Sequence, residues 1–154
     1  MDGYSKDEWY NLSKKFSFKD QAFIDGKYCK SLSHETFDCF NPANGELLAK
    51  VSSCDENDVN IAVKSARRVF EKGSWSNKTP SERKNILLKL SQLIMDNQDE
   101  LSILDCLDVG KTSQDCYIYD VPGTSELLQW SAEAIDKIMD EIAPTGNNDL
   151  AMIR

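Results

Sequence analysis

The side chains best suited to nucleophilic or metal chemistry are the thiols of five cysteines and the imidazole of the single histidine, His34. A nucleophilic cysteine needs a neighbouring base or helix terminus that lowers its pKa. Cys106 and Cys116 each lie inside a predicted helix, Cys106 among apolar positions, so both are predicted to be packing thiols, and His34 lies in a polar run. No Cys-x-x-Cys pair or second histidine completes a zinc site. These groups therefore predict no catalytic residue.

The carboxylates and glycines, considered alone, also indicate no particular binding site. Asp105, Asp108 and Asp120 each fit a surface or helix-capping role. The run Asp55-Glu56-Asn57-Asp58 lacks the glycine and the distal glutamate of a calcium loop, and helix capping explains it better. The seven glycines are scattered singly, whereas a phosphate-binding loop needs them clustered. We therefore predict no cofactor-binding residue.

Composition and charge exclude two classes of partner. A chain of 154 residues forms one domain with a sizeable core, and its net charge of -8 opposes binding to nucleic acid. No run approaches the roughly 18 apolar residues of a membrane span. The start, Met1 to Glu8, is acidic and polar, unlike a signal peptide. The odd number of unpaired cysteines suggests reduced, mostly buried thiols, so the expected compartment is the cytoplasm.

The first third of the sequence predicts a short helix followed by strands. Asp7 to Lys15 forms an amphipathic helix, and Phe23 to Tyr28 forms a strand with a turn in or beside it. Two further strands cover Thr36 to Phe40 and Leu47 to Val51. The Asn44-Gly45 pair between them is a strong hairpin signal, because both residues tolerate positive φ.

The rest of the sequence predicts helices with clear start and stop signals. Asp55 begins the first and Gly73 ends it, Thr79-Pro80-Ser81-Glu82 begins the second with a capping box, and Asn97 begins a third that closes at Gly110. A last helical region runs from Ser113 to about Asp140 with an interruption near Pro122. Its predicted buried side consists of Leu127, Trp130, Ala134 and Ile138. After a turn at 145–148, residues 150–153 form a detached strand whose edge is left unpaired.

Several segments in fixed order resemble the amino-terminal part of the aldehyde dehydrogenases, from about Phe23 to the end. They are Asn41-Pro42-x-x-Gly45-Glu46, Val63-x-x-Ala66-Arg67-x-x-Phe70, Trp75, Arg83 and Leu107-Asp108-x-Gly110-Lys111. No single segment is diagnostic, but their order and spacing together are. The runs 120–123, 130–137 and 150–153 most resemble the members that oxidise γ-glutamyl-γ-aminobutyraldehyde and related aminoaldehydes.

The resemblance implies an architecture and three site residues. The fold class is an α+β fragment, a small β-meander with four or five helices and a terminal strand, of a larger α/β enzyme. Residues 1–20 would be a helical extension, 21–143 the first part of the NAD(P)-binding domain, and 144–154 the start of an oligomerisation arm. The Phe40 carbonyl and the Asp108 carboxylate match positions that hold a monovalent cation, and Asp120 matches the wall of the substrate entrance. Thr112 replaces the usual proline, which is expected to loosen the turn.

The resemblance also implies what this sequence does not contain. In the family, the nucleophilic cysteine, the general-base glutamate, the oxyanion-binding asparagine and the cofactor-binding strands all follow the position of Arg154. The parent enzymes are homo-oligomers that use NAD or NADP to oxidise an aldehyde to a carboxylic acid. We expect this chain alone to bind no cofactor and to be inactive. The alternatives are an interaction module that pairs with an intact aldehyde dehydrogenase, and a self-sufficient helical domain of unrelated purpose.

Overall fold

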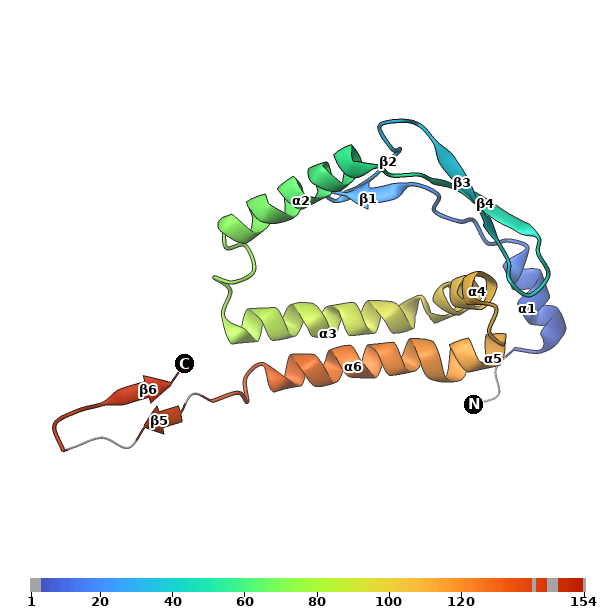
Figure 1. Cartoon of the computed structure of the whole chain (residues 1–154). Helices are drawn as coiled ribbons and strands as arrows, with labels where there is room; N and C mark the ends of the chain where they lie inside the picture. Colours follow the sequence, from blue (N-terminus) through green and yellow to red (C-terminus); the bar gives the residue numbers. More distant parts are fainter. Residues whose placement is uncertain (1–3, 140, 144–146, 154) are drawn as a thin grey trace.

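The computed structural model of the chain describes residues 4–139, 141–143 and 147–153. Helices α3 (Pro80–Asp96) and α6 (Val121–Ala134) lie side by side, and α2 (Glu56–Glu71) and two β-hairpins form a second layer that arches over them (Figure 1). Helices α1 (Lys6–Ser13) and α4 (Gln98–Val109) lie at one end of the molecule, and a third hairpin projects from the other end. The predicted α+β class is confirmed.

The strands form separate two-stranded antiparallel hairpins. Strands β1 (Ala22–Ile24) and β2 (Lys27–Cys29) are joined by Asp25 and Gly26, which both have positive φ, as a tight hairpin turn requires. Strands β3 (Thr36–Phe40) and β4 (Leu47–Ser52) pair with a register shift between Cys39 and Phe40. The predicted hairpin around Asn44-Gly45 is therefore confirmed.

Capping boxes begin the three helices α1, α2 and α3. In α1 (Lys6–Ser13) the box joins Ser5 to Glu8, in α2 (Glu56–Glu71) Asp55 to Asp58, and in α3 (Pro80–Asp96) Thr79 to Glu82. Gly73, with φ of 66°, follows the end of α2 as predicted. Helix α4 (Gln98–Val109) ends at Gly110 in the left-handed conformation.

The last helical region differs from the prediction near Pro122. Helix α5 (Ser113–Asp115) continues into a π-helical segment, η1 (Cys116–Asp120), and then directly into α6 (Val121–Ala134). Because proline donates no backbone hydrogen bond, it is accommodated by a wider turn before it instead of by an interruption. The helix ends at Ala134, before the predicted end near Asp140, which lies outside the described residues.

The predicted buried side of α6 is wrong for its large residues. Leu127 is 65% exposed and Trp130 is 68% exposed, while Ile138, 81% exposed, lies beyond the helix. The buried residues are Val121, Ser125 and Ala132, which share one helical face. Small side chains on this face let α3 approach closely, and the bulky residues of α6 are left on its exposed surface.

Two buried serines join α3 to α6. The Ser91 hydroxyl donates to the Ser125 carbonyl at 2.9 Å, the Ser125 hydroxyl donates to the Ser91 carbonyl at 3.0 Å, and the two oxygens lie 2.8 Å apart. Each hydroxyl is thus satisfied by the opposite helix. Burial of a polar group without such a partner destabilises a fold.

Replacing Ser91 by alanine is expected to lower the free energy of unfolding by about 1–3 kcal/mol, because the Ser125 hydroxyl loses a buried partner. The same is expected of Ser125→Ala. The double variant should cost less than the sum of the two, because the contact between the two hydroxyls is already lost in either single variant and cannot be lost a second time. Urea unfolding of the four proteins measures this coupling, and strictly additive costs would contradict it.

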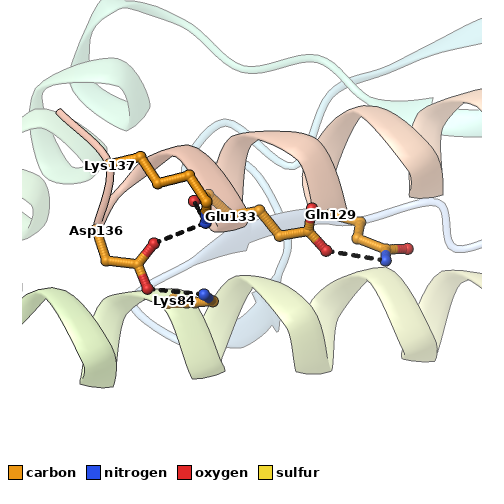
Figure 2. Close-up of polar contacts among 5 residues, drawn as sticks. All are labelled: Lys84, Gln129, Glu133, Asp136 and Lys137. Atoms are coloured by element: carbon orange, nitrogen blue, oxygen red, sulfur yellow. Dashed lines mark hydrogen bonds and ion pairs between the residues drawn. The ribbon is translucent and has the colours of Figure 1, made fainter.

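Ion pairs connect the start of α3 to the end of α6 (Figure 2). Lys84 Nζ donates to Asp136 Oδ2 at 2.8 Å, and Lys137 Nζ reaches Asp136 Oδ1 at 3.1 Å. Lys137 also donates to the Glu133 carbonyl at 2.7 Å. Hydrogen bonds from Lys84 and then Lys137 lower the pKa of Asp136 to about 2.

The lowered pKa of Asp136 predicts acid sensitivity of the α3–α6 pair. A carboxylate with a folded-state pKa of about 2 and an ordinary value of 3.8 stabilises the fold above pH 3.8 and loses that contribution as pH falls towards 2. Lys84→Met should therefore lower the thermal unfolding midpoint at pH 7 and flatten its decline between pH 4 and 2. A decline equally steep in both proteins would contradict this role of the ion pair.

The predicted detachment of the terminal strand is wrong. Strand β6 (Ala151–Ile153) pairs in antiparallel fashion with β5 (Glu141–Ala143). Of the predicted turn at 145–148, residues 145 and 146 lie outside the described part, and Asn147 and Asn148 lie in a turn. Among the helices of the described residues, none has the length and apolar content that crossing a membrane requires.

Apolar packing is concentrated around α1, α4, η1 and α6. Trp9 of α1 is 7% exposed, and its ring makes edge-to-face contacts with the rings of Tyr4 and Tyr117. The hydroxyl of Tyr4 donates to Asp99 at 2.7 Å. Tyr10 of the same helix is 60% exposed. The apolar stripe of α2 is largely uncovered, since Val59, Val63, Val69 and Phe70 are all exposed, Phe70 to 71%.

Candidate functional site

A groove of about 620 Å³ lies where α3, α4, η1 and α6 meet. Its apolar wall comes from Ile94, Leu101, Leu104 and Val121. Its polar residues are Asp105, Asp108, Lys111, Asp120 and Thr124. The groove therefore brings together Asp108 and Asp120, to which the family resemblance assigns separate roles.

Local structure explains how these side chains converge. Asp105 and Asp108 are three residues apart on α4 and so share a helical face. Gly110, with φ of 77°, then reverses the chain and positions Lys111. Thr112 does not leave a loose turn, because its hydroxyl caps α5 by accepting from the Asp115 amide at 3.1 Å. The π-helical segment follows and carries Asp120 to the groove.

Lys111 and Asp120 form an ion pair in the groove. Lys111 Nζ lies 2.6 Å from Asp120 Oδ2, and the two side chains are 47% and 34% exposed. This hydrogen bond is the main cause that lowers the pKa of Asp120 and raises the pKa of Lys111. Asp120 therefore stays ionised well into the acidic range.

Asp105, Cys116 and Asp120 form a close cluster beside this ion pair. Their side-chain oxygen and sulfur atoms all lie within 4.8 Å of one another. Burial, followed by hydrogen bonding with Asp105, raises the pKa of the Cys116 thiol to about 12. A protonated thiol is a poor metal ligand, and Lys111 already supplies a positive charge. The donor set therefore favours a hydrogen-bonded cluster over a metal centre.

The turn of the β3–β4 hairpin lies against the end of α4. The Cys39 thiol donates to Asp108 Oδ1 at 3.4 Å, and this bond is the main cause that raises the pKa of Cys39. A Cβ at Gly110 would lie 2.8 Å from Cγ of Pro42. Phe40 follows Cys39 at the end of the strand. Cation binding by this pair stays a prediction.

The thiols are less buried than predicted, and the pKa values of four of them are raised. Only Cys116 is buried, whereas Cys54 is exposed and the other three are intermediate. The pKa values of Cys39, Cys54, Cys106 and Cys116 are all raised. Cys106 donates to the Lys111 carbonyl at 3.2 Å, as a structural thiol would. None of these four thiols is activated as a nucleophile.

Sequence reasoning missed the place of Asp105 and Lys111 in the groove, and that of Cys116 in the cluster beside it. The spacing of Asp105 and Asp108 was an available signal, because residues i and i+3 of a helix face the same side. The ion pair of Lys111 with Asp120 had no comparable signal, since it depends on the path of the chain between them. His34, predicted to be solvated, is exposed.

Comparisons with known proteins agree with this architecture. The sequence profile of the aldehyde dehydrogenase family matches residues 28–154, so the chain belongs to that family. Aminoacetaldehyde dehydrogenase of Pseudomonas aeruginosa is 44% identical over 97% of this chain and 30% of its own length.

Two solved structures share the backbone arrangement. Indole-3-acetaldehyde dehydrogenase of P. syringae, in complex with NAD+ and IAA, has a TM-score of 0.92 and 41% identity over 97% of this chain and 30% of its own. Gamma-glutamyl-gamma-aminobutyraldehyde dehydrogenase of Burkholderia cenocepacia has a TM-score of 0.88 and 42% identity over 91% of this chain and 28% of its own. The chain thus spans less than a third of the length of these relatives.

Proposed function

We propose that this chain forms the amino-terminal part of an NAD(P)-dependent oxidoreductase that converts an aminoaldehyde to a carboxylic acid, with the groove at Asp120 as the substrate entrance. The observation that carries the proposal is the set of three carboxylates, Asp105, Asp108 and Asp120, beside an apolar wall. Among the residues that the structure describes, Lys111 is the only basic one in the groove lining. The names of the P. aeruginosa and B. cenocepacia relatives, which are aminoaldehyde dehydrogenases, support the substrate class.

The groove offers complementary contacts to the ammonium group and the methylene groups of a short aminoalkyl chain. An ammonium group would exchange with or join the Lys111 ammonium at Asp120, where charge-assisted hydrogen bonds are strong. The methylene groups would lie against Leu101, Leu104 and Val121. Nucleophilic attack and hydride transfer to NAD(P) would depend on residues outside this chain. The thiols whose pKa values are raised here do not supply a thiolate. We therefore expect no NAD(P) reduction by the chain alone.

Binding of a small amine to the full chain tests the groove directly. Propylamine is expected to shift the backbone amide resonances of Lys111, Asp120 and Thr124, while propan-1-ol, of equal length but uncharged, leaves them in place. The expected affinity is weak, because one charged contact contributes about 1.5–3 kcal/mol. Equal shifts with the alcohol, or shifts confined to other regions, would contradict the proposed substrate class.

We also propose that the Phe40 carbonyl and the Asp108 carboxylate help to hold a monovalent cation. Both are oxygen ligands, which hard cations prefer, and the thiol of Cys39, the residue before Phe40, donates to Asp108. Replacing choline chloride by potassium chloride at equal ionic strength is expected to raise the thermal unfolding midpoint of the chain by a few degrees, through ligand linkage. Asp108→Asn should abolish the rise. A rise unchanged in Asp108→Asn would contradict the site.

The finer organisation remains part of the proposal. Residues 1–20 form an extension, 21–143 the first part of the NAD(P)-binding domain, and 144–154 the start of an oligomerisation arm in a cytoplasmic homo-oligomer. The β5–β6 hairpin spans the boundary at 143/144. The alternative is that the chain pairs with an intact aldehyde dehydrogenase. The expected unpaired edge of the terminal strand no longer supports it, because β6 pairs with β5. The uncovered apolar stripe of α2 is the observation that still favours a protein partner.

A further inference from the structure

The ammonium group of Lys111 already contacts the carboxylate to which the proposed function assigns a substrate ammonium. Lys111 Nζ lies 2.6 Å from Asp120 Oδ2, the distance of a charge-assisted hydrogen bond. Among the described residues that line the groove, this one ammonium group faces three carboxylates. A primary amine that enters the groove therefore presents to Asp120 the same chemical group as Lys111 does.

The backbone of Lys111 is held in place, whereas its side chain is partly free. The Lys111 carbonyl accepts from the Cys106 thiol at 3.2 Å. On either side of it, Gly110 has the left-handed conformation and the Thr112 hydroxyl caps α5. The Lys111 side chain is 47% exposed, so its ammonium group can exchange Asp120 for water while these backbone contacts stay intact.

Lys111 remains charged while it contacts Asp120. The hydrogen bond with Asp120 is the main cause that raises the pKa of Lys111, and the charge of Asp105 raises it further. The side chain therefore does not release Asp120 by losing its proton at neutral pH, and it must move away as a cation. Asp105 also lines the groove and provides a second carboxylate near which the displaced ammonium group can remain.

We propose that Lys111 is an internal competitor of the substrate amine, which neutralises Asp120 in the empty groove and is displaced when a primary alkylammonium binds. The apparent affinity for the amine is then reduced by the fraction of molecules in which Lys111 holds the carboxylate. An uncharged ligand cannot displace the ion pair. Lys111 is thus a specificity-determining residue and not a catalytic one. This inference rests on the proposed function of the groove and adds the residue that sets its affinity.

Titration of the full chain with propylamine, for the wild type and Lys111→Met, tests the competition. The dissociation constant, followed by the amide resonances of Asp120 and Thr124, is expected to fall about two- to fivefold in the variant, the range of a partly exposed ion pair. Lys111→Gln should tighten binding in the same way. Lys111→Arg keeps the cation and should bind propylamine as weakly as the wild type. Propan-1-ol should leave these resonances in place in all four proteins.

A second lysine controls for the net charge of the chain. Lys64→Met removes one positive charge from an exposed position of α2 outside the groove, and it should leave the affinity for propylamine unchanged. Tightening by the same factor in Lys64→Met would overturn the inference, because the cause would then be net charge and not the contact with Asp120.

The titrations separate the competition from the proposed function. Propylamine binding by the wild type that is equal or weaker in both Lys111→Met and Lys111→Gln would overturn the competition and leave the proposed function standing. Binding by these two neutral variants alone would support the competition and contradict recognition of the amine by the wild-type groove. Absence of binding in all the proteins would overturn both.

Discussion

Replacing Asp120 by asparagine is expected to lower kcat/KM for an aminoaldehyde by about 10- to 100-fold, the effect of losing a hydrogen bond to a charged group. The enzyme for this measurement is the P. aeruginosa relative with its matched region replaced by this chain. Asparagine keeps the size of the side chain but removes the negative charge that pairs with Lys111 and would pair with a substrate ammonium. The substrate would be 3-aminopropanal, and the readout is the rate of NADH formation.

Two comparisons isolate the charge at Asp120. Oxidation of butanal, which matches 3-aminopropanal in length but has no amine, should change little in the same variant. Asp115→Asn removes a carboxylate from an exposed position outside the groove and should leave both rates unchanged. Equal losses for the two aldehydes would indicate a structural role for Asp120 and would contradict its role in recognising the amine.

Replacing Gly110 by alanine is expected to destabilise the chain by about 2 kcal/mol or more. A left-handed residue with a side chain costs roughly 1–2 kcal/mol, and a new methyl group in a filled space adds to that cost. At Gly110 the φ is 77°, and a Cβ would lie 2.8 Å from the ring of Pro42. The hairpin would have to move away from the end of α4, and the hydrogen bond from Cys39 to Asp108 would lengthen. Urea unfolding measures the loss.

A matched glycine separates the two causes. Gly26 has the same φ of 77°, but a Cβ there meets nothing within 4 Å. Gly26→Ala should therefore show only the conformational cost. The combination Gly110→Ala with Pro42→Ala should recover part of the loss, because the smaller side chain removes the clash. Equal destabilisation by Gly110→Ala and Gly26→Ala would show that the contact with Pro42 has no energetic weight.

Elements with local signals were predictable from the sequence. The capping boxes at Asp55 and Thr79 defined the starts of α2 and α3, and Asn44-Gly45 defined the β3–β4 hairpin. The box of Ser5 with Glu8 has the same pattern and was available as a signal for the start of α1. These features depend on residues three or four positions apart, which is the range over which a sequence pattern specifies hydrogen bonds.

Elements that depend on distant partners were not predictable. The contact of Ser91 with Ser125 joins residues 34 positions apart and sets the buried side of α6. Hydrophobic periodicity placed Leu127 and Trp130 inside, because it records apolar character and not the neighbour that covers it. Pairing of β6 with β5 was missed because a short strand carries no signal for its partner.

The candidate site shows the same division between local and distant information. The roles of Asp108 and Asp120 came from the resemblance to the family, since neither residue is distinctive alone. Their meeting in one groove depends on the left-handed turn at Gly110 and on the π-helical segment before Val121. Lys111 belongs to the family motif, but only the structure shows that its ammonium contacts Asp120.

The most direct test is the ratio of kcat/KM for 3-aminopropanal to that for butanal in the chimeric enzyme that carries this chain. Carboxylates at the groove of an aminoaldehyde dehydrogenase should favour the charged substrate by at least tenfold at pH 7, and added salt should reduce that preference. A chimera that is active but oxidises the two aldehydes equally well, or prefers butanal, would contradict the assignment of this groove to an aminoaldehyde.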